Sequence, residues 1–407
     1  MDNVTHPESL IEGEQVSDAV SETSTIQYDH EPFADYQLRV RELLCDLYGS
    51  STGAPADIAR IPGGSFNSII GVTILQSNVP KTLILRVPRF DDSTVVDQVA
   101  MLRYLRPFIP VPEVEGYNPS SHNSLGEPYM LLHRLPGQNL YSVWDYLDSA
   151  QRCDIAKQVA QLISKILRVP LPPGIGPISC NANGELCIGR IPTTPPWPDE
   201  TGTIQESNTT ETWTHIPTTF SAYVHTRLAE FRRNAARSES GGGSMVDLYD
   251  RLLDVCRGLL DSFAHSGRVA LFQRDFVPRN LLAQSSRQYG TWTITGVLDW
   301  DGYEAAPYES ATVWPSWLWH KGGETGAEFD KSDYDTDIPV TDGGSAQIKQ
   351  VFLREIETLE PGFQDAVRRS RDCHLGALYE RARAGIWTNE HIKDVKRATE
   401  GAMKLIA

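Results

Sequence analysis

Three polar residues in the segment 271–304 have the types and the spacing that a phosphate-handling site needs. Asp275 precedes Asn280 by five positions, and Asp299 follows an apolar run that ends at Leu298. A carboxylate can orient a hydroxyl nucleophile, while an amide oxygen and a second carboxylate are the oxygen ligands that a hard cation such as Mg²⁺ prefers. The spacing therefore predicts phosphoryl transfer, with Asp275 orienting the acceptor hydroxyl and Asn280 and Asp299 holding the metal ion.

Short loops after apolar strands would present these side chains. Residues 269–272 form an apolar strand before Asp275, and residues 294–298 form another before Asp299. Taken singly, Asp275 or Asn280 could also cap a turn, because aspartate and asparagine are common at such positions. The hairpin that leads to Asp299 favours the joint, functional interpretation.

The same segment resembles a known family motif. QRDFVPRN at 273–280, followed by LDW at 298–300, resembles the aminoglycoside phosphotransferase (APH) motif, which is close to H-G-D-x-x-x-x-N followed by I-D-W. Gln273 replaces the motif's histidine, whose main task in such loops is to hold the loop's shape. The resemblance implies an α+β, bilobal, protein-kinase-like fold, with a small N-terminal lobe of antiparallel sheet plus helix and a larger, mainly helical C-terminal lobe. It also implies ATP or GTP and Mg²⁺ as cofactors.

Two weaker motifs would contribute to nucleotide binding. Gly63, Gly64 and Ser65 lie between strand-like runs and resemble the family's phosphate-covering turn, where backbone N–H groups can approach the nucleotide because glycine has no side chain. Leu132 lies in the apolar run 129–137, which resembles the segment whose backbone reads the adenine edge. The alternatives are an ordinary Gly-Gly hairpin and an interior strand that ends in a Pro-Gly turn.

Arg86 and Gln98 are the remaining nucleotide-site candidates. Arg86 projects from an apolar strand, about where the family's lysine would contact the phosphates, and a buried arginine needs an anionic partner. The resemblance aligns Gln98 with the glutamate that pairs with that lysine, and a glutamine cannot neutralise a guanidinium. Either Asp97 substitutes, or Arg86 keeps its charge for phosphate, or the pairing has been lost.

Asp301, Glu304 and Trp317 are the candidates for the substrate site. An acidic site would suit an amine-bearing alcohol. Asp301 could instead add a carboxylate to the metal or lie in a solvated turn. Trp317 belongs to a dense aromatic cluster that either walls a substrate pocket or packs the helical lobe.

Composition and the positions of proline-rich segments predict the organisation of the chain. Residues 1–30 are polar and acidic and predict a disordered or loosely attached arm. Residues 31–138 predict the nucleotide-binding lobe and residues 139–407 the helical lobe. A Pro-rich insertion at 169–218 is too long for a simple connector, and the catalytic segment is 271–304.

The overall charge and composition restrict the partners. The formal charge is 37 − 53 = −16 without a basic run, which argues against a nucleic-acid surface. No apolar run approaches membrane-spanning length, and the six cysteines are scattered. We therefore expect a soluble, cytoplasmic protein with reduced thiols, acting on a small-molecule substrate, and the sequence leaves its oligomeric state open.

Three functions from different classes fit these residues. The first is a small-molecule kinase that uses Asp275, Asn280 and Asp299 as described above. The second is a kinase-fold protein that binds nucleotide without turnover, which Gln98 and Gln273 favour. The third is a kinase-fold enzyme that uses its aspartates as general acid and base in non-phosphoryl chemistry on a small metabolite.

Overall fold

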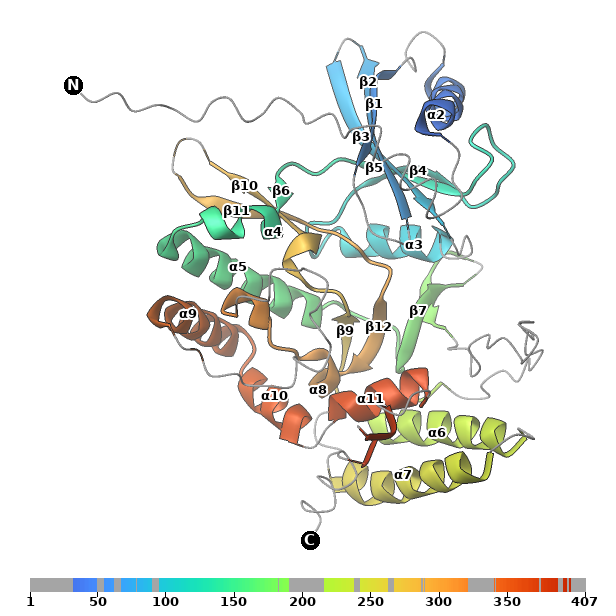
Figure 1. Cartoon of the computed structure of the whole chain (residues 1–407), viewed down its shortest axis with the longest axis vertical. Helices are drawn as coiled ribbons and strands as arrows, with labels where there is room; N and C mark the ends of the chain where they lie inside the picture. The colour runs from blue at the N-terminus through green and yellow to red at the C-terminus, as the bar shows by residue number, and fades with distance from the viewer. Residues whose placement is uncertain are drawn as a thin grey trace. The chain divides into compact units, whose positions relative to one another are not determined.

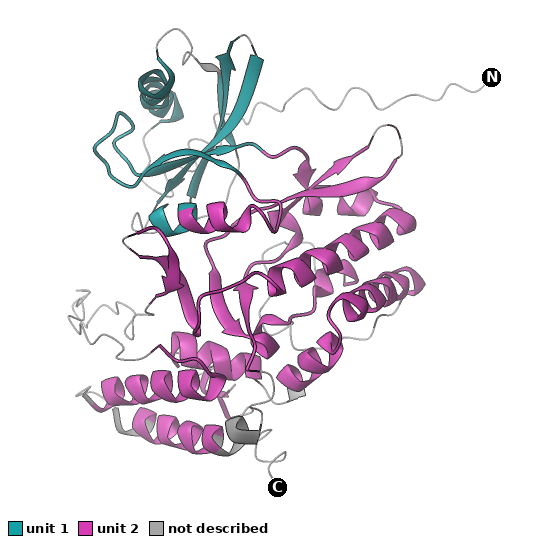
Figure 2. Ribbon diagram, turned by 180° about the vertical axis from the view of Figure 1, so that it is seen from behind, with its two compact units in different colours: residues 1–99, 113–134 teal, residues 100–112, 135–407 magenta. Residues whose placement is uncertain are grey.

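The structure is a computed structural model in which the chain falls into two compact units (Figure 2). The first unit takes residues 1–99 and 113–134, and the second takes residues 100–112 and 135–407. The described residues are 32–49, 55–61, 67–77, 79–89, 95–181, 183–189, 216–237, 242–262, 267–286, 288, 290–320, 340, 342–372, 375–386, 391–393 and 395–396.

An antiparallel sheet forms the body of the first unit. Its five strands have the order β1-β2-β3-β5-β4, and every neighbouring pair is antiparallel. The strands are β1 (Pro55–Ile61), β2 (Asn67–Gln76), β3 (Val79–Pro88), β4 (Val114–Asn118) and β5 (Tyr129–His133). The helices are α2 (Phe33–Tyr48) and α3 (Val95–Leu105), the latter shared with the second unit.

Helix α2 and this sheet share one apolar core. Val40, Leu43 and Leu44 are spaced so that they lie on one face of the helix, and all three are buried. In β2, Ile70, Val72 and Ile74 are two apart, so they share one face of the strand, and they belong to the same core cluster. The helical and the strand periodicities therefore meet in a single interior.

The second unit combines helices with two small antiparallel sheets (Figure 1). Their orders are β11-β10-β6 and β8-β7-β12-β9. The strands are β6 (Gln138–Asn139), β7 (Gly176–Cys180), β8 (Leu186–Ile188), β9 (Val269–Gln273), β10 (Leu281–Ser285), β11 (Trp292–Val297) and β12 (Tyr303–Pro307). The helices are α4 (Leu140–Val143), α5 (Ser149–Leu167), α6 (Phe220–Arg237), α7 (Gly242–Ser262), α8 (Tyr308–Ala311), α9 (Gly343–Leu359), α10 (Phe363–Asp372) and α11 (Leu375–Ala384), with 3-10 turns η2 (Trp144–Tyr146), η3 (Pro278–Asn280) and η4 (Ser316–Leu318).

Helix α5 supports the β10–β11 hairpin. The helix begins at a capping box in which Asp148 and Gln151 satisfy each other's backbone N–H groups. Further along, the Gln158 side chain donates to the Trp292 carbonyl at 2.8 Å and accepts from the Ile294 N–H at 2.8 Å. One glutamine thus fixes β11, the strand that leads to Asp299, against α5.

Close backbone approach brings β6 onto the other edge of that hairpin. Gly137 has a φ of 110°, and a Cβ placed there would lie 2.6 Å from the Ala283 carbonyl oxygen. Only glycine fits both conditions. The predicted Pro-Gly turn after β5 therefore has a structural task, which is to seat β6 beside β10.

The predicted fold class is confirmed. The chain is α+β, with an antiparallel sheet and a helix in the first unit and many helices in the second. The second unit contains more strand than expected, because β7 and β8 lie inside the predicted insertion at 169–218. Residues 190–215 of that insertion and the arm at 1–30 lie outside the described residues. None of the described helices is long and apolar enough to cross a membrane.

Candidate functional site

The segment that follows β9, residues 274–280 and here called the Asp275 loop, is closed by a side-chain contact between two of the candidate site residues. The Asn280 amide nitrogen donates to the Asp275 backbone oxygen at 3.0 Å and to its carboxylate Oδ2 at 2.8 Å. Asn280 is buried, while the Asp275 side chain is 38% exposed. The structure therefore brings these two predicted residues together and leaves the carboxylate accessible.

Asp299 reaches the same loop through backbone contacts. The β10–β11 hairpin pairs Leu281 with Val297, and the Leu298 N–H then donates to the Asn280 carbonyl at 2.8 Å. Asp299 follows directly, is exposed, and has a φ of 59°. A left-handed conformation is uncommon for a residue with a side chain, and it costs energy that surrounding contacts must offset.

Gln273 supplies one of those contacts. Its side-chain nitrogen donates to the Asp299 carbonyl oxygen at 2.9 Å, and the residue is buried. Glutamine thereby joins the end of β9 to the turn at Asp299. The departure from the family's histidine does not remove the loop-shaping hydrogen bond, because an amide N–H can donate as an imidazole N–H does.

Two tryptophans hold the flanks of the site. The buried Trp300 donates its indole N–H to the Val297 carbonyl at 3.1 Å, which fixes the turn after Asp299. Trp317 donates to the Phe276 carbonyl at 3.2 Å inside the Asp275 loop. Trp317 is buried and packs edge-on against Trp144, with ring centroids 5.9 Å apart. This placement favours the packing role for Trp317 over a pocket wall.

Two arginines of the Asp275 loop are missed by reasoning from the motif. Arg279 contacts both oxygens of the Asp275 carboxylate, at 2.8 and 2.7 Å, and its side chain is 49% exposed. Its spacing of four from Asp275 gives no clear signal, because that spacing brings side chains together on an α-helix and residues 274–277 are not helical. Arg274 pairs with Glu304 and Glu380, and no local pattern announces contacts of 30 and 106 residues' separation.

The predicted substrate contact of Glu304 is at odds with its position. Glu304 lies on β12, its side chain is 5% exposed, and Arg274 donates to its carboxylate at 3.0 Å. Burial raises the pKa of the Glu304 carboxyl, against the opposing effect of Arg274 and Arg383. A carboxylate so enclosed is a structural partner of Arg274. Asp301, in contrast, is exposed beside Asp299 in sequence and stays a candidate for substrate contact.

The candidates of the first unit lie in or near the five-stranded sheet. Arg86 on β3 and Gln98 on α3 are both buried, as their apolar neighbourhoods predict. Leu132 lies within β5, which has β3 on one side and β4 on the other. The β4–β5 pairing is irregular opposite Leu132, between Val114 and Gly116, and the adenine contact through the backbone of Leu132 stays a prediction. Gly63, Gly64 and Ser65 lie outside the described residues.

The donor set near Asp275 suits Mg²⁺ held jointly with phosphate. Among the described residues, no group of three or more His, Cys, Asp or Glu side chains is arranged to hold a metal ion. Mg²⁺ is commonly bound by one or two protein oxygens together with phosphate oxygens and waters. The Asn280 side chain gives both of these hydrogen bonds through its nitrogen, which leaves the chemistry of its Oδ1 compatible with a cation. These residues fit a magnesium–nucleotide complex.

A carboxylate fixed by an amide five residues later, with a second carboxylate after a hairpin, is the arrangement found in kinase-type phosphotransferases. The chain belongs to that class. The model of the phosphotransferase enzyme family, APH, matches residues 57–318, well over half of the chain, and the protein is a member of this family. The predicted family resemblance is confirmed.

Two curated relatives match a short part of the chain. A stretch of 122 residues is 33% identical to a subtelomeric hrmA-associated cluster protein found in two strains of Aspergillus fumigatus, covering 28% of this chain and 23% of the relative. The match thus spans about a quarter of the length of these curated relatives.

Two solved structures are similar over most of the chain. The ADP-bound aminoglycoside phosphotransferase APH(2'')-Ib is 11% identical, with a TM-score of 0.48 and coverage of 90% of this chain and 98% of that one. An ethanolamine kinase of Plasmodium vivax is 10% identical, with a TM-score of 0.49 and coverage of 99% and 95%.

Proposed function

We propose that the protein transfers the γ-phosphoryl group of ATP or GTP to a hydroxyl group of a small metabolite. The observation that carries the proposal is the contact between the Asp275 carboxylate and the Asn280 amide, next to the strained turn at Asp299. Membership of a phosphotransferase family supports the same reaction class.

Asp275 is the residue that orients the acceptor. Its carboxylate already accepts hydrogen bonds from Asn280 and Arg279, which hold it in one orientation. A carboxylate has about four lone-pair sites, so a hydroxyl can still donate to it from the exposed side. Asp275 then accepts the hydroxyl proton as the oxygen attacks phosphorus.

Asn280 and Asp299 are the proposed ligands of Mg²⁺. When bound, the ion neutralises charge on the bridging phosphate oxygens. Gln273 and Trp300 hold the Asp299 turn in place for this role. In the first unit, Arg86 is proposed to contact the phosphates, with Gln98 as a neutral neighbour, and the Gly63–Ser65 turn is proposed to cover them.

The acceptor is proposed to be an alcohol that carries an amine, with Asp301 as its contact. Asp301 is exposed and lies two residues after Asp299. A cationic group would be attracted to this acidic turn, and the net charge of −16 aids its approach.

One alternative is binding of nucleotide without turnover. Of its two sequence arguments, the Gln273 departure loses force, since this glutamine supplies the hydrogen bond to the Asp299 carbonyl. The replacement of the family's glutamate by Gln98 is what supports this alternative. Acid–base chemistry without a nucleotide would instead appear as turnover that needs neither ATP nor Mg²⁺.

A nucleotide titration followed by a transfer assay tests the proposal. Unfolding temperature is measured with ATP and with GTP, each with and without Mg²⁺, and phosphorylated product is then sought on a panel of amine-bearing and neutral alcohols. We expect a magnesium-dependent shift and transfer to at least one alcohol. No shift at millimolar nucleotide refutes the proposal, and a shift without transfer to any alcohol supports the non-turnover alternative.

Matched variants separate the roles of the two carboxylates. Asp275→Asn is expected to lower kcat by at least about 100-fold with nucleotide binding retained, because it removes the proton acceptor. Asp299→Ala is expected to abolish the magnesium-dependent part of the shift. Asp254→Asn is the control, since Asp254 forms an equally local pair with Arg257, at 2.9 Å, on the exposed face of α7.

A further inference from the structure

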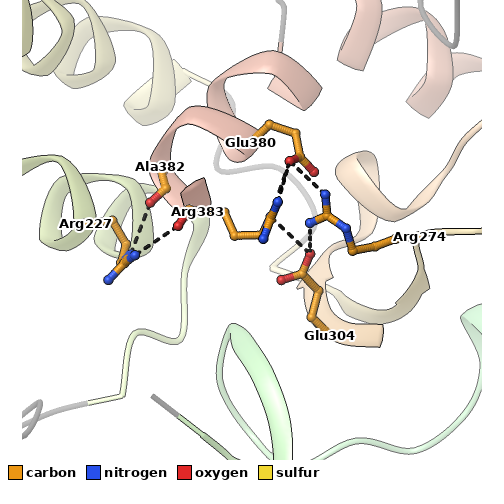
Figure 3. Close-up of polar contacts among 6 residues, drawn as sticks. All are labelled: Arg227, Arg274, Glu304, Glu380, Ala382 and Arg383. Atoms are coloured by element: carbon orange, nitrogen blue, oxygen red, sulfur yellow. Dashed lines mark hydrogen bonds and ion pairs between the residues drawn. The ribbon is translucent and has the colours of Figure 1, made fainter. Parts of the chain in front are cut away.

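Arg274, the residue immediately before Asp275, joins three separate segments of the second unit. Its guanidinium donates to Glu304 of β12 at 3.0 Å and to Glu380 of α11 at 2.9 Å (Figure 3). The Arg383 side chain, one turn beyond Glu380, contacts the same two carboxylates, at 3.1 Å to Glu380 and 4.0 Å to Glu304. We call these four residues the Arg274 network.

The Arg274 network is largely withdrawn from water and balanced in charge. The Arg274 side chain is 13% exposed and the Glu304 side chain 5% exposed. Burial alone lowers the pKa of the Arg274 guanidinium, but Glu380 and Glu304 outweigh burial and hold that pKa above its ordinary value. Buried ion pairs contribute little net stability compared with well-packed apolar groups, because desolvation offsets their attraction. The network instead fixes the orientation of the Arg274 side chain, because a planar guanidinium that bridges two carboxylates is held in one position.

Helix α11 is itself anchored, so it can serve as a fixed reference. Arg227 of α6, fully buried, donates to the carbonyls of Ala382 at 3.1 Å and Arg383 at 2.9 Å at the C-terminal end of α11 (Figure 3). Tyr379 stacks on Tyr223 with ring centroids 5.3 Å apart. The helix is thus tied to α6 by hydrogen bonds and by packing.

Arg274 of the network is joined by a single peptide bond to Asp275, the proposed base. The backbone of Arg274 is also held by a hydrogen bond from its N–H to the Gly302 carbonyl at 3.0 Å. The contacts of Arg274 therefore restrain the backbone at the start of the Asp275 loop. We propose that helix α11 is a positioning element for phosphoryl transfer: Glu380 and Arg383 hold Arg274, and Arg274 holds Asp275 in line with the acceptor hydroxyl. This inference rests on the proposed function of Asp275.

The test compares two carboxylates that are both held by arginines. Glu380→Gln removes the charge that α11 offers to Arg274. Glu360→Gln removes an even more buried charge, which lies between Arg168 and Arg268 and has no contact with the Asp275 loop. A misplacement of about 1 Å at a reacting group can cost roughly 100-fold in rate. We expect Glu380→Gln to lower kcat by roughly 10- to 100-fold with the KM for nucleotide changed less than about twofold, and Glu360→Gln to leave both unchanged.

A second variant and a second measurement distinguish a loss of positioning from a general loss of stability. Arg274→Lys keeps the charge, but a single ammonium cannot reproduce the planar bridge. If Glu380 acts through Arg274, the kcat of the double variant that combines Glu380→Gln with Arg274→Lys is no lower than that of the slower single variant. Hydrogen exchange at the amides of 275–277 and 279–281 is expected to be about tenfold faster in Glu380→Gln than in Glu360→Gln or the wild type.

The outcomes are distinct. Wild-type kcat in Glu380→Gln, an equal loss in Glu360→Gln, or additive losses in the double variant would each overturn the positioning role. A wild-type protein that transfers phosphate to no acceptor defeats the proposed function instead. In that case the exchange rates alone decide whether α11 holds the Asp275 loop.

Discussion

Replacing Gln273 by methionine separates the two things that this residue does. The side-chain nitrogen tethers the Asp299 carbonyl, while its Oε1 is buried and accepts no hydrogen bond from the described residues. Methionine removes both atoms with little change in shape. The lost hydrogen bond costs about 0.5–1.5 kcal/mol, and the removal of a buried, unsatisfied acceptor recovers about 1–3 kcal/mol. We therefore expect the free energy of unfolding to be unchanged or slightly increased.

Activity is expected to respond in the opposite direction. The turn at Asp299 has a φ of 59°, a conformation that costs of order 1–3 kcal/mol and that the tether helps to hold. Losing about 0.5–1.5 kcal/mol of restraint lowers the population of this turn by roughly 2- to 13-fold. The magnesium-dependent kcat should fall, or the apparent KM for Mg²⁺ should rise, by the same factor in steady-state assays.

The matched variant is Gln273→His, which retains an N–H donor. It should keep kcat and the KM for Mg²⁺ within about twofold of the wild type, on the free-energy scale where 1.36 kcal/mol is tenfold. Unaltered kinetics in Gln273→Met would show that the tether has no bearing on the metal site. An equal loss in both variants would show that the volume of the side chain matters and the donor does not.

Three further predictions concern stability and reactivity. Burial alone raises the pKa of the Glu115 carboxyl, but hydrogen bonds from Lys81 and His133 outweigh it and lower that pKa from its ordinary value of 4.5. The stability from this ionised group is thus present above that value and lost as pH falls through the folded-state pKa. Glu115→Gln should then cost about 1–3 kcal/mol at pH 7, and the difference in unfolding midpoint should vanish in acid; a constant difference contradicts this. Arg227→Met should cost about 3–5 kcal/mol in chemical denaturation, because buried carbonyls and a carboxylate lose their partner. Burial raises the pKa of the Cys256 thiol to about 12, so a thiol reagent at pH 8 should label this residue only after unfolding.

Local pattern was sufficient for the elements with a strong period. Apolar residues recur at helical spacing within 35–50 and 93–107 of the sequence, and the structure places α2 and α3 there with ends displaced by about two residues. The apolar runs at 58–75 and 82–90 likewise became β1, β2 and β3. In each case the side chains that define the period are those that the sheet or helix buries.

Local pattern failed where burial is polar or where pairing is distant. Strand β12 reads Tyr-Glu-Ala-Ala-Pro, and a charged residue and a proline both argue against an inner strand. This strand accommodates Glu304 because Arg274, the residue that follows the paired strand β9, donates to its carboxylate. Only the folded chain brings these two residues together. The pairing of β7 with β12 depends in the same way on two segments far apart in sequence.

In the candidate site, too, local spacing predicts some residues, while contacts between distant residues are not predicted. Asp275, Asn280 and Asp299 could be named from spacing, because their separation is set by one loop and one hairpin. Charge and position suggest a substrate contact for Glu304, but they do not predict its burial or its ion pair with Arg274, which only the folded chain provides. The contact between Arg279 and Asp275 depends on the turn between them, which the helical spacing rule does not predict.

The glutamine at the end of β9 also affects how the protein responds to acidity. A histidine at this position would gain or lose a proton between about pH 5 and 8, and its donor pattern would change with it. The amide of Gln273 has no proton to exchange in that range, so the bond to the Asp299 carbonyl is indifferent to it. Activity should therefore not change with pH in this range through a loss of this hydrogen bond.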